Sequence, residues 1–500
     1  MRRFPHLLDA FSWLSLSALV LSLLPIGHVS ADGIGQSLSL SAGFVRWNPN
    51  HLLVEPIGAW WQGLLAPSSS RAEAVDHLRL LSVFAGSIAV GLFRLGVASR
   101  LASSRLAANH ATLWLGAGSA FARLWVLDEI YMLQMPSVVA VALFTLRYLE
   151  RPSLLRAAAA GASVTLAAAF FVSNLLLGPA LAVALWRRRG DAAALLTGNL
   201  ATAGALFAGI WALSRTPHGF VDWLTRYGGG TQSPRVEAAY GLQPTLAGFA
   251  ESAGRALYGA ACALVDLAPA VATFRDGLPV GPEIVCGLLA FAAAVLALLL
   301  SRPDPRAALL FTTWTAAVLG FGVFWNNSDD QFYVPLSVGF AALAARMPPR
   351  RAVVALGLAA LLWNVVDVAQ RRLFYPRQER LALIEEELGG AGLVIYPGFD
   401  EMEVLLQLEA GPPTVSMTGT ATRFPFDEGM DQLAGEIGET LAQGRPVALV
   451  DILDAPPNRS PWKFLRRMGY EHARVVEILS RFPVDPARQM GPFSVQWIQP

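Results

Sequence analysis

Long apolar stretches separated by short polar segments run through the first three-quarters of the chain. Each stretch is close to the roughly 20 residues that a helix needs to cross about 30 Å of hydrocarbon. The period-2 alternation of strands is absent, so the pattern predicts helices, which satisfy their own backbone hydrogen bonds inside a bilayer. The eleven predicted spans lie approximately at 10–26, 77–97, 107–125, 130–148, 156–172, 174–187, 193–213, 282–300, 307–325, 332–347 and 352–370.

Two of these assignments leave an alternative open. The fifth and sixth spans are separated only by Ser173 and Asn174, so one long kinked helix is also compatible with the pattern and would reverse the orientation downstream. The first span is followed by Val29-Ser30-Ala31, which resembles a signal-peptide cleavage site. We expect a retained helix because the apolar run is longer than a usual signal core.

The arginines predict how the spans are oriented. Arginine in short loops favours the cytoplasmic side of a membrane. Every second connection carries arginines, namely Arg100 and Arg105; Arg147, Arg151 and Arg156; Arg187, Arg188 and Arg189; Arg302 and Arg306; Arg346, Arg350 and Arg351. The alternate connections carry acidic residues instead. This alternation predicts that segments 31–76 and 214–281 and the C-terminal tail all lie outside the cytoplasm.

The chain after the last span has a different pattern. Short apolar runs at 392–396, 414–417, 447–452 and 493–498 alternate with helical stretches such as 378–388 and 430–443. Such alternation predicts a small α/β domain. The fold class is therefore an all-α polytopic membrane bundle of about eleven spans, over residues 1–370, followed by a soluble extracytoplasmic domain over 371–500.

Composition agrees with the bilayer assignment and excludes several classes of protein. The chain is 54% hydrophobic and 15% charged, with a mean hydropathy of +0.45, whereas soluble domains carry nearer a quarter charged residues. Its two cysteines, Cys262 and Cys286, are too few for a disulfide framework or a zinc site. There is no phosphate-binding or dinucleotide-binding glycine motif, and we expect no nucleic-acid partner.

Acidic residues gather in three of the predicted external loops. Asp32 follows the first span, the Asp128–Glu129 pair precedes the fourth, and Asp329 and Asp330 precede the tenth. A carboxylate beside an apolar cleft can act as a general base, and several together can hold a divalent cation. The alternative is that these side chains are solvated or stabilise helix N-termini.

The external segments offer further candidate groups. Residues 53–65 hold paired tryptophans and are too short to span, which predicts a helix lying in the membrane interface beside a lipid-borne substrate. Candidate substrate-binding residues are His51, Glu55, Asp329, Asp330, Tyr333 and His218. An ordinary structural role is the alternative for His51. One external arginine would bind a lipid phosphate, from the set Arg215, Arg226, Arg235 and Arg255.

This arrangement resembles the GT-C superfamily of membrane glycosyltransferases, including the protein O-mannosyltransferase and aminoarabinose-transferase types. The similarity consists of an acid, Asp32, directly after the first span, an interfacial stretch from Asn48 to Trp61, and a second acidic position, Asp128–Glu129, before the fourth span. An external soluble domain after the last span completes it. The resemblance covers residues 1–370 and implies that Asp32 is the catalytic base, with Asp128 and Glu129 positioning an acceptor or a metal.

The resemblance implies an inverting transferase in a bacterial inner membrane that moves a sugar from a polyprenyl-phosphate carrier to a glycan, lipid or protein acceptor in the periplasm. Membrane lipids are expected partners. Metal dependence stays open; a divalent cation, Mg²⁺ or Mn²⁺, would bind at Asp32, Asp128 and Glu129. The alternatives are a transporter or lipid flippase, and a noncatalytic scaffold whose tail binds a partner. The predicted spans hold few charged residues, which disfavours a transporter.

Overall fold

The structure, a computed structural model, describes most of the 500 residues. The residues outside the description are 1–3, 24–46, 48–50, 66–70, 128–129, 215–218, 229–244, 268–269, 272–279, 302–303, 326–329, 348–350, 370–376, 399–405, 407–411 and 455–459.

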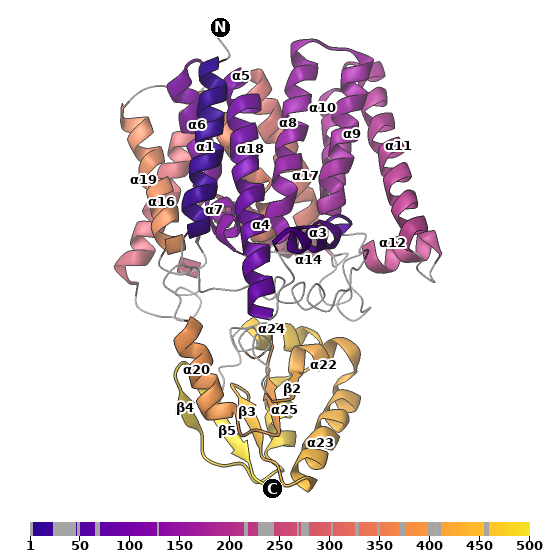
Figure 1. The fold of residues 1–500 in the computed structure, drawn as a ribbon, viewed down its shortest axis with the longest axis vertical. Coiled ribbons are helices and arrows are strands. Elements are labelled where there is room, and N and C mark those ends of the chain that lie inside the picture. Colours follow the sequence, from indigo (N-terminus) through magenta and orange to yellow (C-terminus); the bar gives the residue numbers. More distant parts are fainter. Residues whose placement is uncertain are drawn as a thin grey trace.

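A helical bundle makes up the larger part of the described chain, with a smaller α/β domain below it in Figure 1. The helices that follow the predicted spans are α1 (Phe4–Leu23), α4 (Arg71–Leu92) with the π-helical turn η2 (Phe93–Ala98) and α5 (Ser99–Leu101), α6 (Arg105–Gly116) with α7 (Ser119–Val126), α8 (Met135–Glu150), α9 (Leu154–Phe170), α10 (Leu177–Ala184), α11 (Arg189–Ser214), α16 (Pro282–Leu299), α17 (Pro305–Trp325), α18 (Leu336–Ala344) and α19 (Arg351–Val368). We call the end of the bundle that holds Phe170 the domain end, and the end that holds Glu150 the free end.

The bundle has the surface of a multi-pass membrane protein. Within the described residues, six helices are long and apolar enough to cross a membrane, and three further apolar helices are shorter. Large apolar side chains face outwards, as on α11, where Leu200 and Leu213 are 68% and 73% exposed. Water would solvate such a surface poorly, whereas lipid tails match it. The count of eleven spans remains a prediction.

The break predicted near Ser173 is a real interruption between two helices. The backbone of Phe171 is extended, after which the short helix η4 (Val172–Leu176) leads into α10. Leu154 lies beside Gly190, and Thr165 donates a hydrogen bond to the Asn199 backbone at 2.9 Å, so α9 and α11 run in the same direction. The segment between them must therefore return across the bundle, which favours two separate segments over one kinked helix.

Ion pairs bring arginine-bearing connections together at the free end. Arg100, after α4, lies 3.2 Å from Glu150 at the end of α8. Arg346, after α18, lies 3.1 Å from Asp304, which precedes α17. In each case two connections that the arginine pattern assigns to one side of the membrane do meet at one end.

The C-terminal domain contains a five-stranded sheet in the order β2-β1-β3-β5-β4. Its strands are β1 (Leu393–Tyr396), β2 (Thr414–Ser416), β3 (Val447–Val450), β4 (Arg488–Met490) and β5 (Phe493–Ile498). The first three are mutually parallel, while β5 is antiparallel to β3 and to β4. The four predicted strands are confirmed, and β4 was not predicted because its three residues carry no apolar run.

Alternate residues of the strands pack on opposite faces of this sheet. On one face, Leu393 and Ile395 pack against α22 (Met417–Arg423), α23 (Phe426–Ala442), α24 (Ser460–Arg467) and α25 (His472–Leu479). On the other face, Val394 and Tyr396 pack against α20 (Arg377–Leu388). Val75, near the start of α4, belongs to this second core, so α4 joins the bundle to the domain. Figure 1 shows α4 extending from the bundle towards the domain.

Candidate functional site

Five aromatic rings from distant parts of the chain meet at the domain end of the bundle. We call them the aromatic cluster: His51, Tyr131, Phe171, Phe321 and Phe332. Tyr131 lies in the short helix η3 (Ile130–Gln134), and Phe332 lies in η5 (Asp330–Tyr333). The centroids of these two rings are 5.3 Å apart, and each ring also contacts Phe171, at 5.4 and 5.6 Å. The cluster therefore joins the external segment that holds His51 to the ends of four different predicted spans.

His51 is held in one orientation by this cluster. Its ring stacks on Phe171 at 5.3 Å with an interplanar angle of 11°, and it meets the edge of Tyr131. Its Nδ1 lies 3.1 Å from the carbonyl oxygen of Phe170. A carbonyl only accepts, so Nδ1 donates and the neutral ring presents Nε2 as an acceptor. Burial lowers the pKa of His51 to about 4, against the opposing effect of this hydrogen bond.

The segment after His51 is tied to the bundle by its backbone. Leu53 N donates to Ala169 O at 2.9 Å, and α3 (Val54–Leu65) begins at the next residue. The predicted interfacial segment is therefore helical, and Figure 1 shows α3 lying across the end of the bundle. Trp60 points outwards and is 62% exposed, whereas Trp61 donates to His77 O at 2.8 Å. Only one of the paired tryptophans is thus available to a membrane interface.

Two more predicted residues are buried near this cluster. Glu55 lies in the first turn of α3 and is only 8% exposed, and the positive end of that helix favours its carboxylate. Tyr333, next to Phe332, is fully buried. Its side chain fits against Gly259 of α14 (Leu246–Leu264) and Gly322 of α17. An added Cβ would lie 2.3 Å from the ring at Gly259 and 2.1 Å from the hydroxyl oxygen at Gly322.

A buried polar contact ties η3 to η4. Asn174 donates to Gln134 Oε1 at 2.7 Å and to Ala167 O at 3.1 Å, and both side chains are almost fully buried. Neither Gln134 nor the aromatic cluster was predicted. The sequence did predict the interruption of the helix near Ser173. It did not predict that the ring of Phe171 contacts other aromatic side chains there.

The predicted acids themselves lie mostly outside the described residues. Outside the description are Asp32, Asp128, Glu129, His218 and Asp329. Asp330 begins η5 by its backbone, and its side chain is not described. Within the described residues, no group of three or more His, Cys, Asp or Glu side chains could hold a metal ion. The metal site predicted at Asp32, Asp128 and Glu129 falls outside that search and stays a prediction.

Of the four predicted external arginines, Arg255 is the one whose side chain lies within the described residues. Arg255 is ion-paired with Glu251 at 2.6 Å, one turn away on α14. The side chain of Arg226 and all of Arg215 and Arg235 lie outside the description. Two further half-buried arginines lie in helices of the bundle, namely Arg79 near the start of α4 and Arg123 near the end of α7, and both fall inside apolar runs of the sequence.

Comparisons with known proteins give a likeness to solved structures and none to a family model or a curated protein. No protein-family model and no curated protein matches this chain. Among solved structures, the chain is similar to ArnT from Cupriavidus metallidurans in the apo state, with 14% identity, a TM-score of 0.39, and 98% of each chain covered.

Proposed function

We propose that this protein is a membrane glycosyltransferase of the GT-C kind. It transfers a sugar from a polyprenyl-phosphate carrier to a hydroxyl group of an acceptor at the domain end of the bundle, on the extracytoplasmic side. Asp32 is the general base, Asp128 and Glu129 position the acceptor or a divalent cation, and the direct displacement inverts the anomeric carbon.

The observation that carries this proposal is the convergence of the acid-bearing segments on the aromatic cluster. His51 belongs to the external segment that holds Asp32, Tyr131 follows Glu129 by two residues, and Phe332 follows Asp330 by two. The cluster thus gathers the residues next to two of the acidic positions together with a residue of the external segment that holds the third. Such a gathering supports one shared site rather than three separate solvated loops.

The chemistry suits an apolar, ring-lined site. Desolvation favours the protonated form of a carboxylic acid, so a carboxylate there is a stronger base than in water. The base takes the proton of the acceptor hydroxyl while that oxygen bonds to the anomeric carbon. The bond from this carbon to the carrier phosphate breaks, and the phosphate leaves with the electron pair. The half-buried Arg79 and Arg123 are candidates to bind that phosphate through bidentate hydrogen bonds.

The position of α3 supports a lipid-borne donor. The helix exposes Trp60 and Leu64, at 62% and 60%, on the side away from the bundle. Its other side packs inwards through Gly58 and Gln62. An amphipathic helix of this kind lies at the boundary between headgroups and acyl chains. A polyprenyl chain in the bilayer would thus present its phosphate at the level of the aromatic cluster.

The test is an assay of the rate of sugar transfer. A panel of radiolabelled polyprenyl-phosphate sugars serves as donors, and membranes of a strain that lacks this protein supply the acceptor. We expect Asp32→Asn to lower the rate by about 10²–10⁴-fold, the usual contribution of a general base. Glu283→Gln is the matched control, because Glu283 is an exposed acid in the first turn of α16 and should leave the rate unchanged. Full activity of Asp32→Asn would contradict the proposed base, and lipid transport without bond cleavage would favour the flippase alternative.

A further inference from the structure

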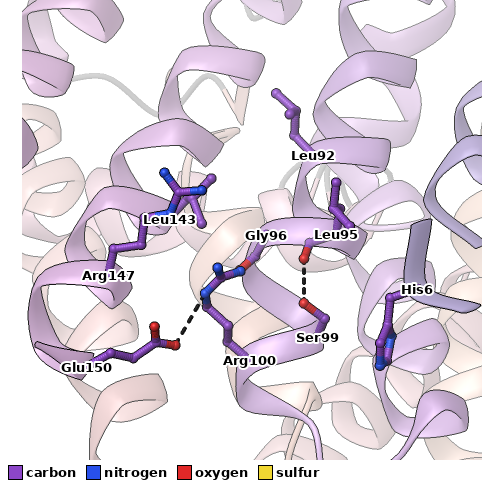
Figure 2. A pocket seen from close by; sticks show the side chains of 9 residues that line it. All are labelled: His6, Leu92, Leu95, Gly96, Ser99, Arg100, Leu143, Arg147 and Glu150. Atoms are coloured by element: carbon purple, nitrogen blue, oxygen red, sulfur yellow. Dashed lines mark hydrogen bonds and ion pairs between the residues drawn. The ribbon is translucent and has the colours of Figure 1, made fainter. Parts of the chain in front are cut away.

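A polar pocket lies at the free end of the bundle, far from the aromatic cluster. Its volume is about 480 Å³, and it opens between the start of α1, the η2–α5 region and the end of α8 (Figure 2). Its polar lining includes His6, Ser99, Arg100, Arg147 and Glu150. None of these residues has a part in the proposed transfer, so the pocket calls for a separate explanation.

Two arginines give this pocket a net positive charge. Arg100 donates to Gly96 O at 2.7 Å and lies 3.2 Å from Glu150, so its charge is partly balanced. Arg147 stands one turn before Glu150 on α8, with its guanidinium 5.8 Å from the ring centroid of Phe144. No described carboxylate forms an ion pair with Arg147. Its donors are therefore available to an anion that enters the pocket.

His6 adds a neutral donor on the opposite wall. Its Nδ1 lies 2.9 Å from Nη1 of Arg94. Arginine has no acceptor, so Nδ1 must accept and the ring proton sits on Nε2. Arg94 is itself held by Asp9 and by Asn109, which fixes the position of the His6 ring. The lining thus combines two guanidinium groups and an imidazole N–H, a donor set that suits phosphate oxygens.

The remaining wall of the pocket is apolar and faces outwards. Leu92, Leu95 and Leu143 line it, and Leu95 is 37% exposed on the outer surface of the bundle. A small soluble anion gains nothing from such a wall, whereas the glycerol backbone and upper acyl chain of a lipid bury apolar area there. Basic pockets between transmembrane helices at the cytoplasmic side bind the headgroups of anionic lipids.

We propose that this pocket binds the phosphate-bearing headgroup of an anionic phospholipid from the leaflet at the free end. Arg147 and Arg100 contact the phosphate, and the three leucines contact the lipid below its headgroup. Glu150 competes with the phosphate for Arg100, so its charge weakens the binding. The site is independent of the sugar transfer at the domain end.

The test is native mass spectrometry of the delipidated full-length protein in detergent, titrated with phosphatidylglycerol, phosphatidylcholine or inorganic phosphate. We expect phosphatidylglycerol to bind more tightly than phosphatidylcholine. Arg147→Gln should weaken phosphatidylglycerol binding about tenfold, the loss of one charge-assisted hydrogen-bonding group. Glu150→Gln should strengthen it. Arg156→Gln removes the same charge at the same end but outside the pocket, where Arg156 donates to Arg151 O, and should leave binding unchanged.

Specific results would overturn the proposal. Equal weakening by Arg147→Gln and Arg156→Gln would mean attraction to the surface charge rather than binding in the pocket. Weaker binding by Glu150→Gln would reverse the assigned role of that carboxylate. Binding of inorganic phosphate as tight as that of phosphatidylglycerol would exclude the lipid as the specific ligand. None of these readings depends on transferase activity, so the two proposals fail separately.

Discussion

The two ends of the bundle are organised by different interactions. At the free end the described residues are joined by ion pairs, with Asp9 bound to Arg94 and Arg105, Arg100 to Glu150, and Asp304 to Arg306 and Arg346. At the domain end they are joined by ring contacts around Phe171. Ion pairs with buried partners hold helices in place, but the charges in them are balanced by each other. The rings of the domain end are apolar, so a carboxylate beside them would be a stronger base than in water, as the proposed transfer requires.

The position of the buried ion pair also bears on the transporter alternative. Arg94 lies inside the span predicted at 77–97 and is fully buried, so that span is less free of charge than expected. Transporters carry such groups near the bilayer midplane. Asp9, its partner, is five residues after the first residue of α1, which places it about 7.5 Å along the helix from the free end. Arg105 in the adjacent connection binds the same carboxylate, so Asp9 and its two arginines anchor one end of the bundle.

The largest expected effect of a substitution is therefore at the free end. Asp9→Ala leaves Arg94 buried without its carboxylate, and breaking a buried ion pair typically costs about 3–5 kcal/mol. We expect a large fall in the midpoint of thermal unfolding of the detergent-solubilised protein. Arg105→Gln is the matched comparison, because the Arg105 side chain is 61% exposed and water screens its pair with Asp9, so we expect a much smaller fall. Similar midpoints for the two variants would show that the Asp9–Arg94 pair does not hold this end together.

The sequence predicted the helices and strands whose pattern of apolar and polar residues lies within one short stretch of chain. Apolar runs located the helices of the bundle, and alternation of short strands and helices located β1, β2, β3 and β5. The interfacial helix was predicted as 53–65 and is Val54–Leu65. An apolar run that is too short to span a membrane can form few structures other than a helix at its surface. Arginine placement predicted which connections meet at the free end, as the Arg100–Glu150 and Arg346–Asp304 contacts show.

The interactions that organise each end had no such signal. The rings of the aromatic cluster come from separate segments, and a single aromatic residue in an apolar run looks like any other core residue. Arg94 is likewise one charge in a long apolar stretch, and its partner Asp9 lies 85 positions earlier in the chain. Contacts over such separations depend on the tertiary fold, which periodicity does not encode. Tyr131 and Phe332, two residues after Glu129 and Asp330, are the members of the aromatic cluster that follow the predicted acids directly.

The pH dependence of stability should separate the two ends. The pKa of His51 is about 4 in the folded protein, below its usual 6.5, so the unfolded chain binds an extra proton between these values. The contribution of His51 to the free energy of unfolding is fully present above about pH 6.5. It falls by roughly 3 kcal/mol as the pH drops towards 4. The pKa of Asp304 is lowered from 3.8 to about 2, chiefly by its hydrogen bond with Arg306. The contribution of Asp304 to the free energy of unfolding is present above pH 3.8. It is lost only below that value, as the pH falls through 2.

Thermal unfolding midpoints between pH 7.5 and 4.5 test this separation. His51→Phe keeps a ring against Phe171 and removes the titrating group, so its midpoints should fall less across this range than those of the wild type. Asp304→Asn should follow the slope of the wild type there, because Asp304 stays ionised in both states. A wild-type slope retained by His51→Phe would show that another group titrates at these pH values.

The smallest expected effect concerns the packing of Tyr333 at the domain end. Alanine at Gly259 would place Cβ 2.3 Å from the buried Tyr333 ring, which cannot retreat without moving η5, the helix that begins at Asp330. Overpacking of this kind costs about 1–3 kcal/mol. Gly254 lies on the same helix, and a Cβ added there would meet no other part of the described structure within 4 Å, so Gly254→Ala should be neutral or stabilise by about 0.5–1 kcal/mol. Opposite shifts of the two midpoints, with sugar transfer lowered only in Gly259→Ala, would tie the position of η5 to activity. Equal transfer rates in the two variants would instead show that the ring contacts at this end support the fold alone.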